Sequence, residues 1–300
     1  MITDIIHAPL ENVLEETDRV RTETFGTDID LCAIVNIKSG RCTMNCRFCA
    51  QSRHYDTSVA VYPLLSPEEL SSETCKLWEQ NIPRVGWVSS GCSPTAEELD
   101  TVLAAATTFL AAKSANQICC ASLGQLDPPS LRQLQTAGFS RYHHNLETSE
   151  RFYPSICTTQ RWRDRLATVE RVKELGWTVC SGGLFGLGET WEDRWELALT
   201  LQKLEVDSVP INFLHSIHGT PLANHPPLSP DEALRIVALF RLTLPKATIR
   251  ICGGRPTVFA SREQDELLFR AGANAFMTGN YLTTSGISPE KDRETIGRLC

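Results

Sequence analysis

The sequence predicts an α/β protein, a single (β/α)8 barrel of the TIM type that follows an N-terminal helical extension. Short apolar patterns typical of strands alternate with longer amphipathic patterns typical of helices along most of the 300 residues, and this alternation favours a parallel sheet. No linker-like stretch interrupts it, and single barrels of this type commonly have about 250 residues. A doubly wound open sheet is the alternative fold.

The extension is predicted to occupy residues 1–30 and the barrel residues 31–300. We expect a helical segment from Met1 to Thr27, which could cap the bottom of the barrel or pack in an interface. The predicted strands are Leu31–Ile37, Arg84–Ser90, Gln117–Leu123, Arg141–Glu147, Thr178–Phe185, Ser208–Phe213, Thr248–Cys252 and Ala273–Met277.

Helix patterns fill most of the gaps between these strands. Two helices begin with a clear start signal, a serine cap followed by proline and early acidic residues, at Ser66 and at Ser229. The predicted helices are Pro67–Gln80, Thr95–Ala112, Pro129–Ala137, Trp162–Leu175, Glu192–Leu204, Pro230–Thr243 and Ser261–Ala271.

The composition is that of a globular protein, with 42% hydrophobic residues and no apolar run long enough to span a bilayer. Residues 1–10 lack the charged and apolar pattern of a secretory signal, so we expect a cytoplasmic protein. A net charge of -7 without a basic tract argues against nucleic acid or a membrane surface as partner.

Twelve cysteines are many for a cytosolic chain of this length, and metal thiolates in a reducing compartment explain them better than disulfides do. Four of the cysteines carry no pattern of their own: Cys32, Cys75, Cys157 and Cys300. We expect these four to be buried small hydrophobes or inert surface thiols.

The segment Cys42–Cys49 contains three cysteines, Cys42, Cys46 and Cys49, at the spacing C-x3-C-x2-C. A loop this short makes the three side chains converge on one metal centre. Structural zinc takes four protein ligands, whereas a catalytic centre keeps one position open for a small molecule, so three ligands favour a catalytic centre. A zinc knuckle or three unrelated thiols are the alternatives.

Side chains that point into the barrel can be sorted by strand alternation, because neighbouring strand residues face opposite sides. Arg250 and Cys252 share one face of the seventh strand, and only one of Cys119 and Cys120 can face inward. A buried charge or thiolate must be paired or bound to metal. An inward arginine and cysteine on one strand therefore need partners of this kind.

The fourth predicted strand is also informative. Asn145 and Glu147 share a face, whereas the adjacent His143 and His144 face opposite ways and cannot bind one metal together. We expect both histidines to be structural.

The segment Cys42–Cys49 resembles the loop by which radical S-adenosylmethionine (SAM) enzymes bind a [4Fe-4S] cluster, with SAM on the fourth iron. Its flanks, Leu31–Gly40 and Ala50–Ser52, resemble biotin synthase specifically. The resemblance extends from about Leu31 to Lys291. Further motifs that resemble this family are Tyr142–Ser149, Cys180–Gly183, Gly186–Glu189, Val209–Phe213, Gly219–Leu222, Ala271–Asn274 and Tyr281–Thr284.

The resemblance implies an enzyme that inserts sulfur into dethiobiotin. In this family a reduced [4Fe-4S] cluster cleaves SAM, the resulting 5'-deoxyadenosyl radical takes a hydrogen atom from the substrate, and an auxiliary iron-sulfur cluster donates the sulfur. It also implies flavodoxin or ferredoxin as electron donor, and a homodimer is left open. The alternatives are a radical SAM barrel without sulfur chemistry, of the hydrogenase-maturation or methylornithine-forming type, and a non-catalytic iron-sulfur protein.

The resemblance also assigns residues to the two small molecules. Those implied for SAM are Ser90, Gly91, Asn145, Glu147 and Arg165. Those expected for dethiobiotin are Asn145, Asn212, Thr283 and Thr284, because amides can bind its ureido group and hydroxyls its carboxylate.

The auxiliary cluster departs from the family pattern. The best-known members bind a [2Fe-2S] cluster with three cysteines and an arginine, of which Cys120, Cys180 and Arg250 are matched here, whereas the third cysteine is replaced by Gly86. We expect Cys252 to supply the missing ligand, as in a subclass with a larger auxiliary cluster. The type of cluster, and any part played by Cys92 or Cys119, stay open.

Overall fold

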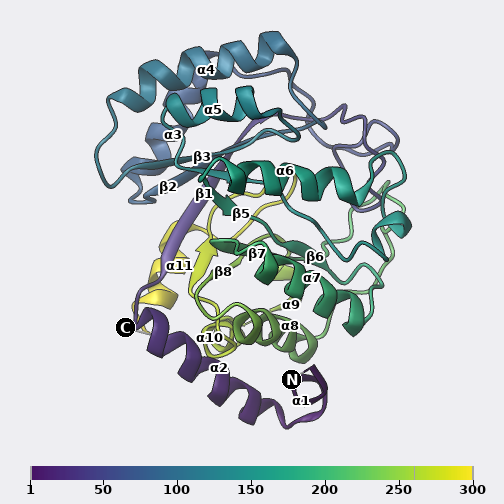
Figure 1. The fold of residues 1–300 in the computed structure, drawn as a ribbon. Helices are drawn as coiled ribbons and strands as arrows, with labels where there is room; N and C mark the ends of the chain where they lie inside the picture. The colour runs from purple at the N-terminus through teal and green to yellow at the C-terminus, as the bar shows by residue number, and fades with distance from the viewer. Residues whose placement is uncertain (1, 260, 299–300) are drawn as a thin grey trace.

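The computed structural model describes residues 2–259 and 261–298 and shows a closed parallel barrel surrounded by helices (Figure 1). Its strands follow the order β5-β4-β3-β2-β1-β9-β8-β7-β6, and a further pairing of β5 with β7 closes the ring. The predicted barrel is thus confirmed, and the open sheet is wrong. The strands are β1 Asp30–Lys38, β2 Arg84–Ser89, β3 Ile118–Ser122, β4 Arg141–His143, β5 Thr178–Cys180, β6 Gly183–Phe185, β7 Ser208–Phe213, β8 Thr248–Ile251 and β9 Ala275–Met277.

The strand predicted from Thr178 to Phe185 is divided into β5 and β6. Between them Gly182 lies so close to β7 that a Cβ atom there would lie 2.0 Å from the carbonyl oxygen of Pro210. Only glycine permits this approach. The two short strands therefore occupy one position in a barrel of eight.

All the helices predicted between strands are present, and their ends differ from the predictions by few residues. Three short helices, α1, α9 and α11, were not predicted individually, and α2 makes up most of the helical extension. The helices are α1 Ile2–His7, α2 Leu10–Phe25, α3 Pro67–Glu79, α4 Ala96–Ala111, α5 Pro128–Thr136, α6 Trp162–Glu174, α7 Trp191–Lys203, α8 Pro230–Thr243, α9 Arg255–Val258, α10 Arg262–Arg270 and α11 Pro289–Ile296, with a 3-10 turn at Tyr153–Ser155.

Helix starts follow from local hydrogen bonds. The Ser66 hydroxyl accepts from the backbone N–H of Glu69, whose carboxylate accepts in return from the backbone N–H of Ser66. Ser229 caps α8 in the same way through the N–H of Glu232. Both predicted start signals are confirmed. In the described part of the chain, no helix has the length and apolar character that crossing a bilayer requires.

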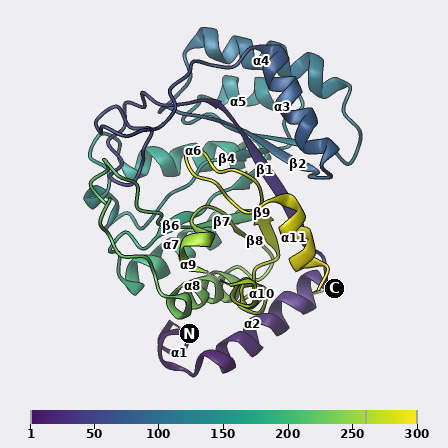
Figure 2. The same ribbon diagram turned by 180° about the vertical axis from the view of Figure 1, so that it is seen from behind.

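The N-terminal helices α1 and α2 pack on the outer helices α8 and α10, as seen from behind in Figure 2. The Thr17 hydroxyl donates to the carbonyl of Arg270 (2.6 Å), and Arg235 donates to the carbonyl of Ile5 (2.5 Å). Arg241, which binds the carbonyl of Ala247 before β8, lies over the Phe25 ring. The extension therefore sits near the amino ends of the strands.

Alternation on β2 shows how the barrel is filled. Val85 and Trp87 are fully buried between the sheet and the helices, whereas Gly86 and Val88 line a cavity inside the barrel. The apolar core thus lies mainly between sheet and helices. The inner face of the sheet is left for polar side chains and thiols.

Candidate active site

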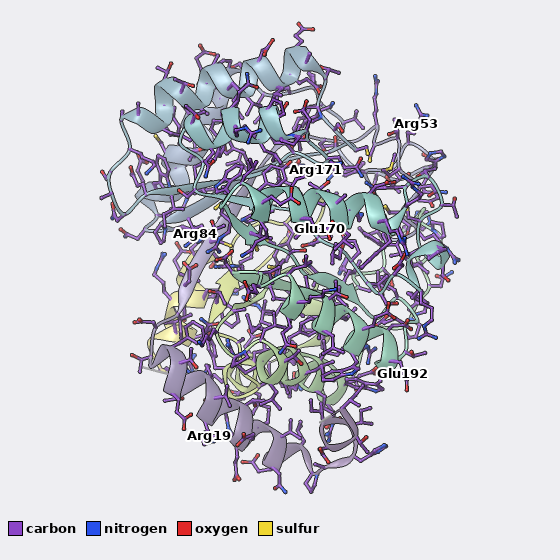
Figure 3. The ribbon with its side chains drawn as sticks, in the orientation of Figure 1. Arg19, Arg53, Arg84, Glu170, Arg171 and Glu192 are labelled. Carbon is purple, nitrogen blue, oxygen red and sulfur yellow. The ribbon has the colours of Figure 1, made fainter. Side chains whose placement is uncertain are left out.

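A cavity of about 400 Å³ occupies the barrel interior and opens at the carboxyl ends of the strands. Its walls come from β1, β2, β4, β7 and β8, from the segment Cys42–Cys49, which we call the cluster loop, and from the loop after β9. In Figure 3, Arg53, just after the cluster loop, and Arg84, at the start of β2, lie on opposite sides of the molecule. Catalytic residues of such barrels gather at the carboxyl end, where the cluster loop lies.

The cluster loop is folded back on itself. The N–H of Cys42 donates to the carbonyl of Gln51 and the N–H of Arg53 to the carbonyl of Cys42, both at 2.9 Å. A turn from the N–H of Cys49 to the carbonyl of Cys46 (3.0 Å) places the last two cysteines together. All three cysteines line the cavity, as predicted.

A second segment, residues 155–159, holds the cluster loop from outside. The N–H of Arg47 donates to the carbonyl of Ile156, and the N–H of Asn45 donates to the Thr159 hydroxyl, both at 2.9 Å. Cys157 is buried, and its thiol is hydrogen-bonded to that of Cys46. Cys157 was expected to be inert, but the structure places it directly behind a loop cysteine.

Ionisation is disfavoured at two of the loop thiols, those of Cys46 and Cys49. Burial raises the pKa of Cys49 to about 11, and the hydrogen bond with Cys157, together with burial, raises the pKa of Cys46 well above its ordinary value. A thiolate in this environment requires a strong cation. A metal centre held by these thiols would supply that charge and displace the protons.

Arg165 organises the polar side of the cavity. Its guanidinium donates to the carbonyl of Asn145 (2.9 Å) and the hydroxyl of Tyr153 (2.8 Å), and it lies 3.4 Å from the carboxylate of Glu147. Burial raises the pKa of Glu147, and Arg165 opposes that rise. Arg165 and Glu147 thus form a buried pair that faces the cavity.

Asn145 and Glu147 were predicted to share a face of the fourth strand. Both line the cavity, but β4 ends at His143, so a regular strand is not the reason. The N–H groups of Leu146 and Glu147 both donate to the carbonyl of Gly182, and Glu147 has a φ of 72°. The segment therefore turns inward at the strand end, and strand alternation does not apply to it.

The other residues assigned to SAM lie at the end of β2. The hydroxyl of Ser90 donates to the carbonyl of Gly40 (2.8 Å), and Gly91 has a φ of 115°. Both line the cavity. This turn connects β2 to the region around the cluster loop.

The residues expected for the substrate line the opposite wall. The Asn212 side chain donates to the carbonyl of Gly183 (3.1 Å) and accepts from the N–H of Gly253 (3.0 Å), which leaves one N–H and one lone pair of its amide for a ligand. Thr283 and Thr284 lie in the loop after β9 and also line the cavity.

Deep in the barrel the structure brings four cysteines together. Cys32, Cys180 and Cys252 lie around Arg250, and Cys120 lies beside Cys180 and accepts from Arg84 (3.9 Å). We call Cys32, Cys120, Cys180, Cys252 and Arg250 the auxiliary chamber; all five are buried. Cys32 lies close enough to Arg250, Cys180 and Cys120 for their charges to affect the pKa of its thiol. The pKa of the Cys252 thiol is likewise affected by the charges of Cys32, Arg250 and Cys180.

Three of these cysteines were predicted to face inward, whereas Cys32 was expected to be a buried small hydrophobe or an inert surface thiol. It is buried, but it lies beside the other cysteines of the chamber. Burial raises the pKa of Cys32 to about 11. Alternation along the first strand was the available signal, because Cys32 shares its face with Ile34, another residue that lines the cavity.

The remaining cysteines lie elsewhere. Cys119 points into the apolar core outside the barrel, as expected if Cys120 faces inward. The thiol of Cys92 lies beyond the end of β2, 3.6 Å from the side-chain oxygen of Gln125. Burial raises its pKa, and the nearby charges that act on it include Arg165 and Cys42, at the cluster-loop end of the cavity. Cys75 lies in α3, and Cys300 lies outside the described residues.

Arg250 is held as a cation. Its Nη2 lies 2.5 Å from Oδ2 of Asp30, the same oxygen that Arg84 approaches to 3.0 Å. Burial opposes the charge, but the surrounding thiols and Asp30 raise the pKa of Arg250 overall. Arg250 is therefore a cation beside the thiols of the chamber.

Two neutral imidazoles, those of His143 and His144, also line the cavity. They were predicted to face opposite ways, and this is wrong because β4 ends at His143. Burial lowers the pKa of both His143 and His144 to about 3, helped for His143 by Arg141, Arg250 and Arg84. Nε2 of each ring is buried without a hydrogen-bond partner among the described residues.

The two thiol sets fit clusters better than single ions. Nowhere in residues 2–259 and 261–298 do three Cys, His, Asp or Glu side chains converge closely enough to hold one ion. The ligands of an iron-sulfur cluster bind different irons and therefore stand farther apart. Three thiols at the rim and four in the chamber match two such groups.

Two family models match the chain. The Radical SAM superfamily matches residues 36–201, and the Biotin and Thiamin Synthesis associated domain matches residues 210–299. The boundary between them falls just before or within β7, inside the closed sheet.

Curated relatives match at high identity. The chain is 50% identical to a biotin synthase of Desulfovibrio desulfuricans over 98% of this chain and 92% of that protein. It is 46% identical to a biotin synthase of Thermodesulfovibrio yellowstonii, over 92% of this chain and 85% of that protein. It is 42% identical to a biotin synthase of Clostridium perfringens, over 98% of this chain and 91% of that protein.

Solved structures share the fold at low identity. Methylornithine synthase superposes with a TM-score of 0.81 at 19% identity, over 99% of this chain and 90% of that chain. HydG, a maturase of the [FeFe]-hydrogenase, superposes with a TM-score of 0.83 at 17% identity, over 99% of this chain and 70% of that chain. At this identity the likeness concerns the barrel alone, so it does not favour those activities.

Proposed function

The chain belongs to the biotin synthase family of radical SAM enzymes, and on this premise we propose how its own residues divide the work of the reaction. The enzyme forms biotin from dethiobiotin with SAM, a [4Fe-4S] cluster and an auxiliary iron-sulfur cluster. When bound, the first cluster supplies the electron that cleaves SAM, and the auxiliary cluster supplies the sulfur.

Cys42, Cys46 and Cys49 would hold the [4Fe-4S] cluster. The support is their convergence on one cavity from a loop fastened at both ends, and their number, which leaves one iron for SAM. The loop lies at the rim, so these thiols bind without disturbing the barrel.

Arg165, Glu147 and Asn145 would bind and orient SAM, with Ser90 and Gly91 at the second-strand turn. A buried guanidinium suits the carboxylate of the methionine part, and a carboxylate and an amide suit a ribose. The support is that Arg165 already contacts the other two residues within the cavity. Fixing SAM in this way aligns its reacting carbon with the substrate and excludes water.

Cys32, Cys120, Cys180 and Cys252 would hold the auxiliary cluster, with Arg250 as a charge partner. The single observation that carries this proposal is the meeting of four buried thiols inside the barrel, three of them around the guanidinium of Arg250 and the fourth, that of Cys120, beside Cys180 and Arg84. Four thiolates suffice for a larger cluster than the [2Fe-2S] type, and none needs to come from the second strand, where Gly86 stands.

Dethiobiotin would lie between SAM and the auxiliary chamber. Asn212 and Asn145 are placed to bind the ureido group, and the hydroxyls of Thr283 and Thr284 to bind the carboxylate. The support is that these residues line the same cavity on the way from its opening to the chamber.

The test of the chamber is a comparison of single Cys→Ala variants by iron and sulfide content and Mössbauer spectra of anaerobic protein. Cys32→Ala should lose auxiliary iron and keep the loop cluster, and Cys92→Ala should keep both. If Cys32→Ala retains full auxiliary iron and Cys92→Ala loses it, the ligand set is wrong.

We also propose a cytoplasmic location, supported by the absence of disulfides among the described cysteines, and a flavodoxin or ferredoxin as electron donor. Three exposed arginines lie in or next to the cluster loop and would attract an acidic carrier: Arg41 before it, Arg47 within it and Arg53 after it. Replacing all three by Glu should slow turnover driven by the protein donor several-fold but not turnover driven by dithionite. Equal effects on both would contradict the docking site.

A further inference from the structure

We propose that the Nε2 atom of His143 hydrogen-bonds to sulfur of the auxiliary cluster and so tunes its reduction potential. The inference deepens the proposed function and rests on the auxiliary chamber that it assigns. In the family pattern quoted above this histidine has no role, and the sequence alone suggested a structural one.

The first observation is the position of His143 on β4. It is the last residue of that strand, it pairs in register with Cys180 on β5, and it lines the cavity. Paired residues on neighbouring strands project from the same face of the sheet. The imidazole therefore stands beside a proposed cluster ligand.

The second observation is that the ring of His143 lies close to Gly86 on the second strand. A Cβ atom at Gly86 would lie 4.0 Å from Cε1 of His143, and Gly86 itself pairs with Cys120. The histidine ring thus lies against the position from which a second-strand cysteine would extend. The imidazole therefore lies next to the strand position that pairs with Cys120, and His143 itself pairs with Cys180.

The third observation is an unmet hydrogen-bonding need. Nε2 of His143 is buried and has no partner among the described residues, and leaving a buried polar atom unpaired is costly. The charged groups that act on the ring are Arg141, Arg250 and Arg84, all donors. The missing partner is therefore an acceptor, and thiolate and sulfide sulfur are the acceptors that an occupied chamber provides.

A hydrogen bond to cluster sulfur withdraws electron density and favours the reduced state. His143→Leu, which removes the donor, should therefore lower the potential of the auxiliary cluster. His143→Gln, which keeps an N–H donor on a side chain of similar reach, should restore most of the difference. We expect a change of at least tenfold in the ratio of oxidised to reduced cluster at a fixed potential, or about 59 mV for a one-electron couple.

The experiment uses the full chain with the three loop cysteines replaced by Ala, so that the auxiliary cluster gives the only iron signal. Its potential is measured by redox titration with EPR detection in the parent, in His143→Leu and in His143→Gln. His7→Gln, at an exposed histidine in α1, is the matched control and should change nothing. Pulsed EPR of the parent labelled with 15N-histidine adds a measurement that needs no substitution at His143.

A weak 15N coupling, with a potential lowered by Leu and restored by Gln, supports the proposal. A strong coupling typical of an iron-bound nitrogen would overturn it, because His143 would then be a ligand. No coupling, or equal potentials in all variants, would overturn it as well. If the parent binds no auxiliary iron, the chamber assignment itself fails, and that outcome is recognised from the iron content before any titration.

Discussion

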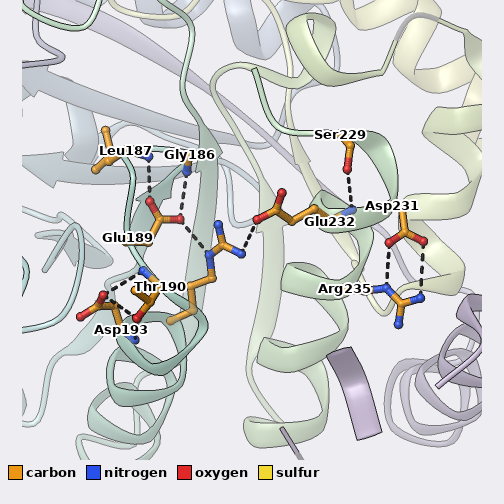
Figure 4. A network of polar contacts seen from close by, with 10 residues as sticks. Gly186, Leu187, Glu189, Thr190, Asp193, Ser229, Asp231, Glu232 and Arg235 are labelled. Carbon is orange, nitrogen blue, oxygen red and sulfur yellow. Dashed lines mark hydrogen bonds and ion pairs between the residues drawn. The ribbon is translucent and has the colours of Figure 1, made fainter. Parts of the chain in front are cut away.

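Glu189 should be essential for holding the turn that follows β6. Its carboxylate is almost completely buried and accepts from the N–H groups of Gly186 (3.0 Å) and Leu187 (2.7 Å) (Figure 4). It also binds Nε of Arg194 at 2.8 Å, and Arg194 reaches Glu232 with Nη1 at 2.7 Å. The perturbation that isolates this carboxylate is Glu189→Gln, which keeps the volume and removes the charge.

The magnitude follows from the contacts. Both carboxylate oxygens face N–H donors, so an amide nitrogen at either position leaves a buried N–H of Gly186 or Leu187 without an acceptor, at a cost of about 1–3 kcal/mol. Breaking a buried ion pair costs about 3–5 kcal/mol, but Arg194 keeps Glu232 as a partner. We therefore expect Glu189→Gln to lower the free energy of unfolding by about 2–4 kcal/mol.

Glu232→Gln is the matched control. The Glu232 side chain is 37% exposed, so its loss should cost about 1 kcal/mol or less. The assay is urea denaturation of cluster-free protein under anaerobic reducing conditions, where cofactor loss does not distort the transition. Equal losses for the two variants, or a loss below about 1 kcal/mol for Glu189→Gln, would refute the reasoning from burial.

Three further predictions concern the site. Replacing the three loop cysteines by Ala should abolish reductive formation of 5'-deoxyadenosine and leave the auxiliary iron in place; SAM cleavage by this variant would contradict the loop assignment. Asn212→Ala should cut biotin formation at least tenfold with SAM binding nearly unchanged, because an unpaired polar group on the substrate is costly; equal losses would show that Asn212 serves SAM or the fold. The two histidines that end and follow β4 have pKa values lowered to about 3, so above pH 6.5 both states of the chain keep them neutral, whereas between pH 6.5 and 3 only the unfolded chain binds protons there. Stability of the cluster-free protein should thus fall by about 1.4 kcal/mol per histidine for each pH unit in that window; His144→Gln should flatten the slope, and an unchanged slope would show that other groups cause it.

Strand alternation was sufficient to predict much of the site. Cys120 faces inward as expected, because β3 is a regular strand whose faces can be assigned from the sequence. Cys252 also faces the cavity as expected, although it directly follows β8. The cluster loop was predictable as well, since its spacing alone makes the thiols converge. These features depend on local geometry, which the sequence carries.

Other features depend on contacts between distant segments. Cys32 looks like any core residue of an apolar strand, and its role appears only when the barrel closes and brings it beside Cys180 and Arg250. Glu147 enters the cavity through a left-handed backbone conformation fixed by the carbonyl of Gly182, which no pattern announces. Cys157 meets Cys46 because a loop folds over the rim.

The depth of the auxiliary chamber bears on the order in which the enzyme would be assembled. Cys120 is 0% and Cys180 1% exposed, whereas Cys42 and Cys49 at the rim are only partly buried. Iron and sulfide would reach the rim directly from solvent, but they would reach the inner thiols only through the cavity that the cluster loop borders. Delivery of the inner cluster would therefore have to precede occupation of that cavity by SAM and substrate.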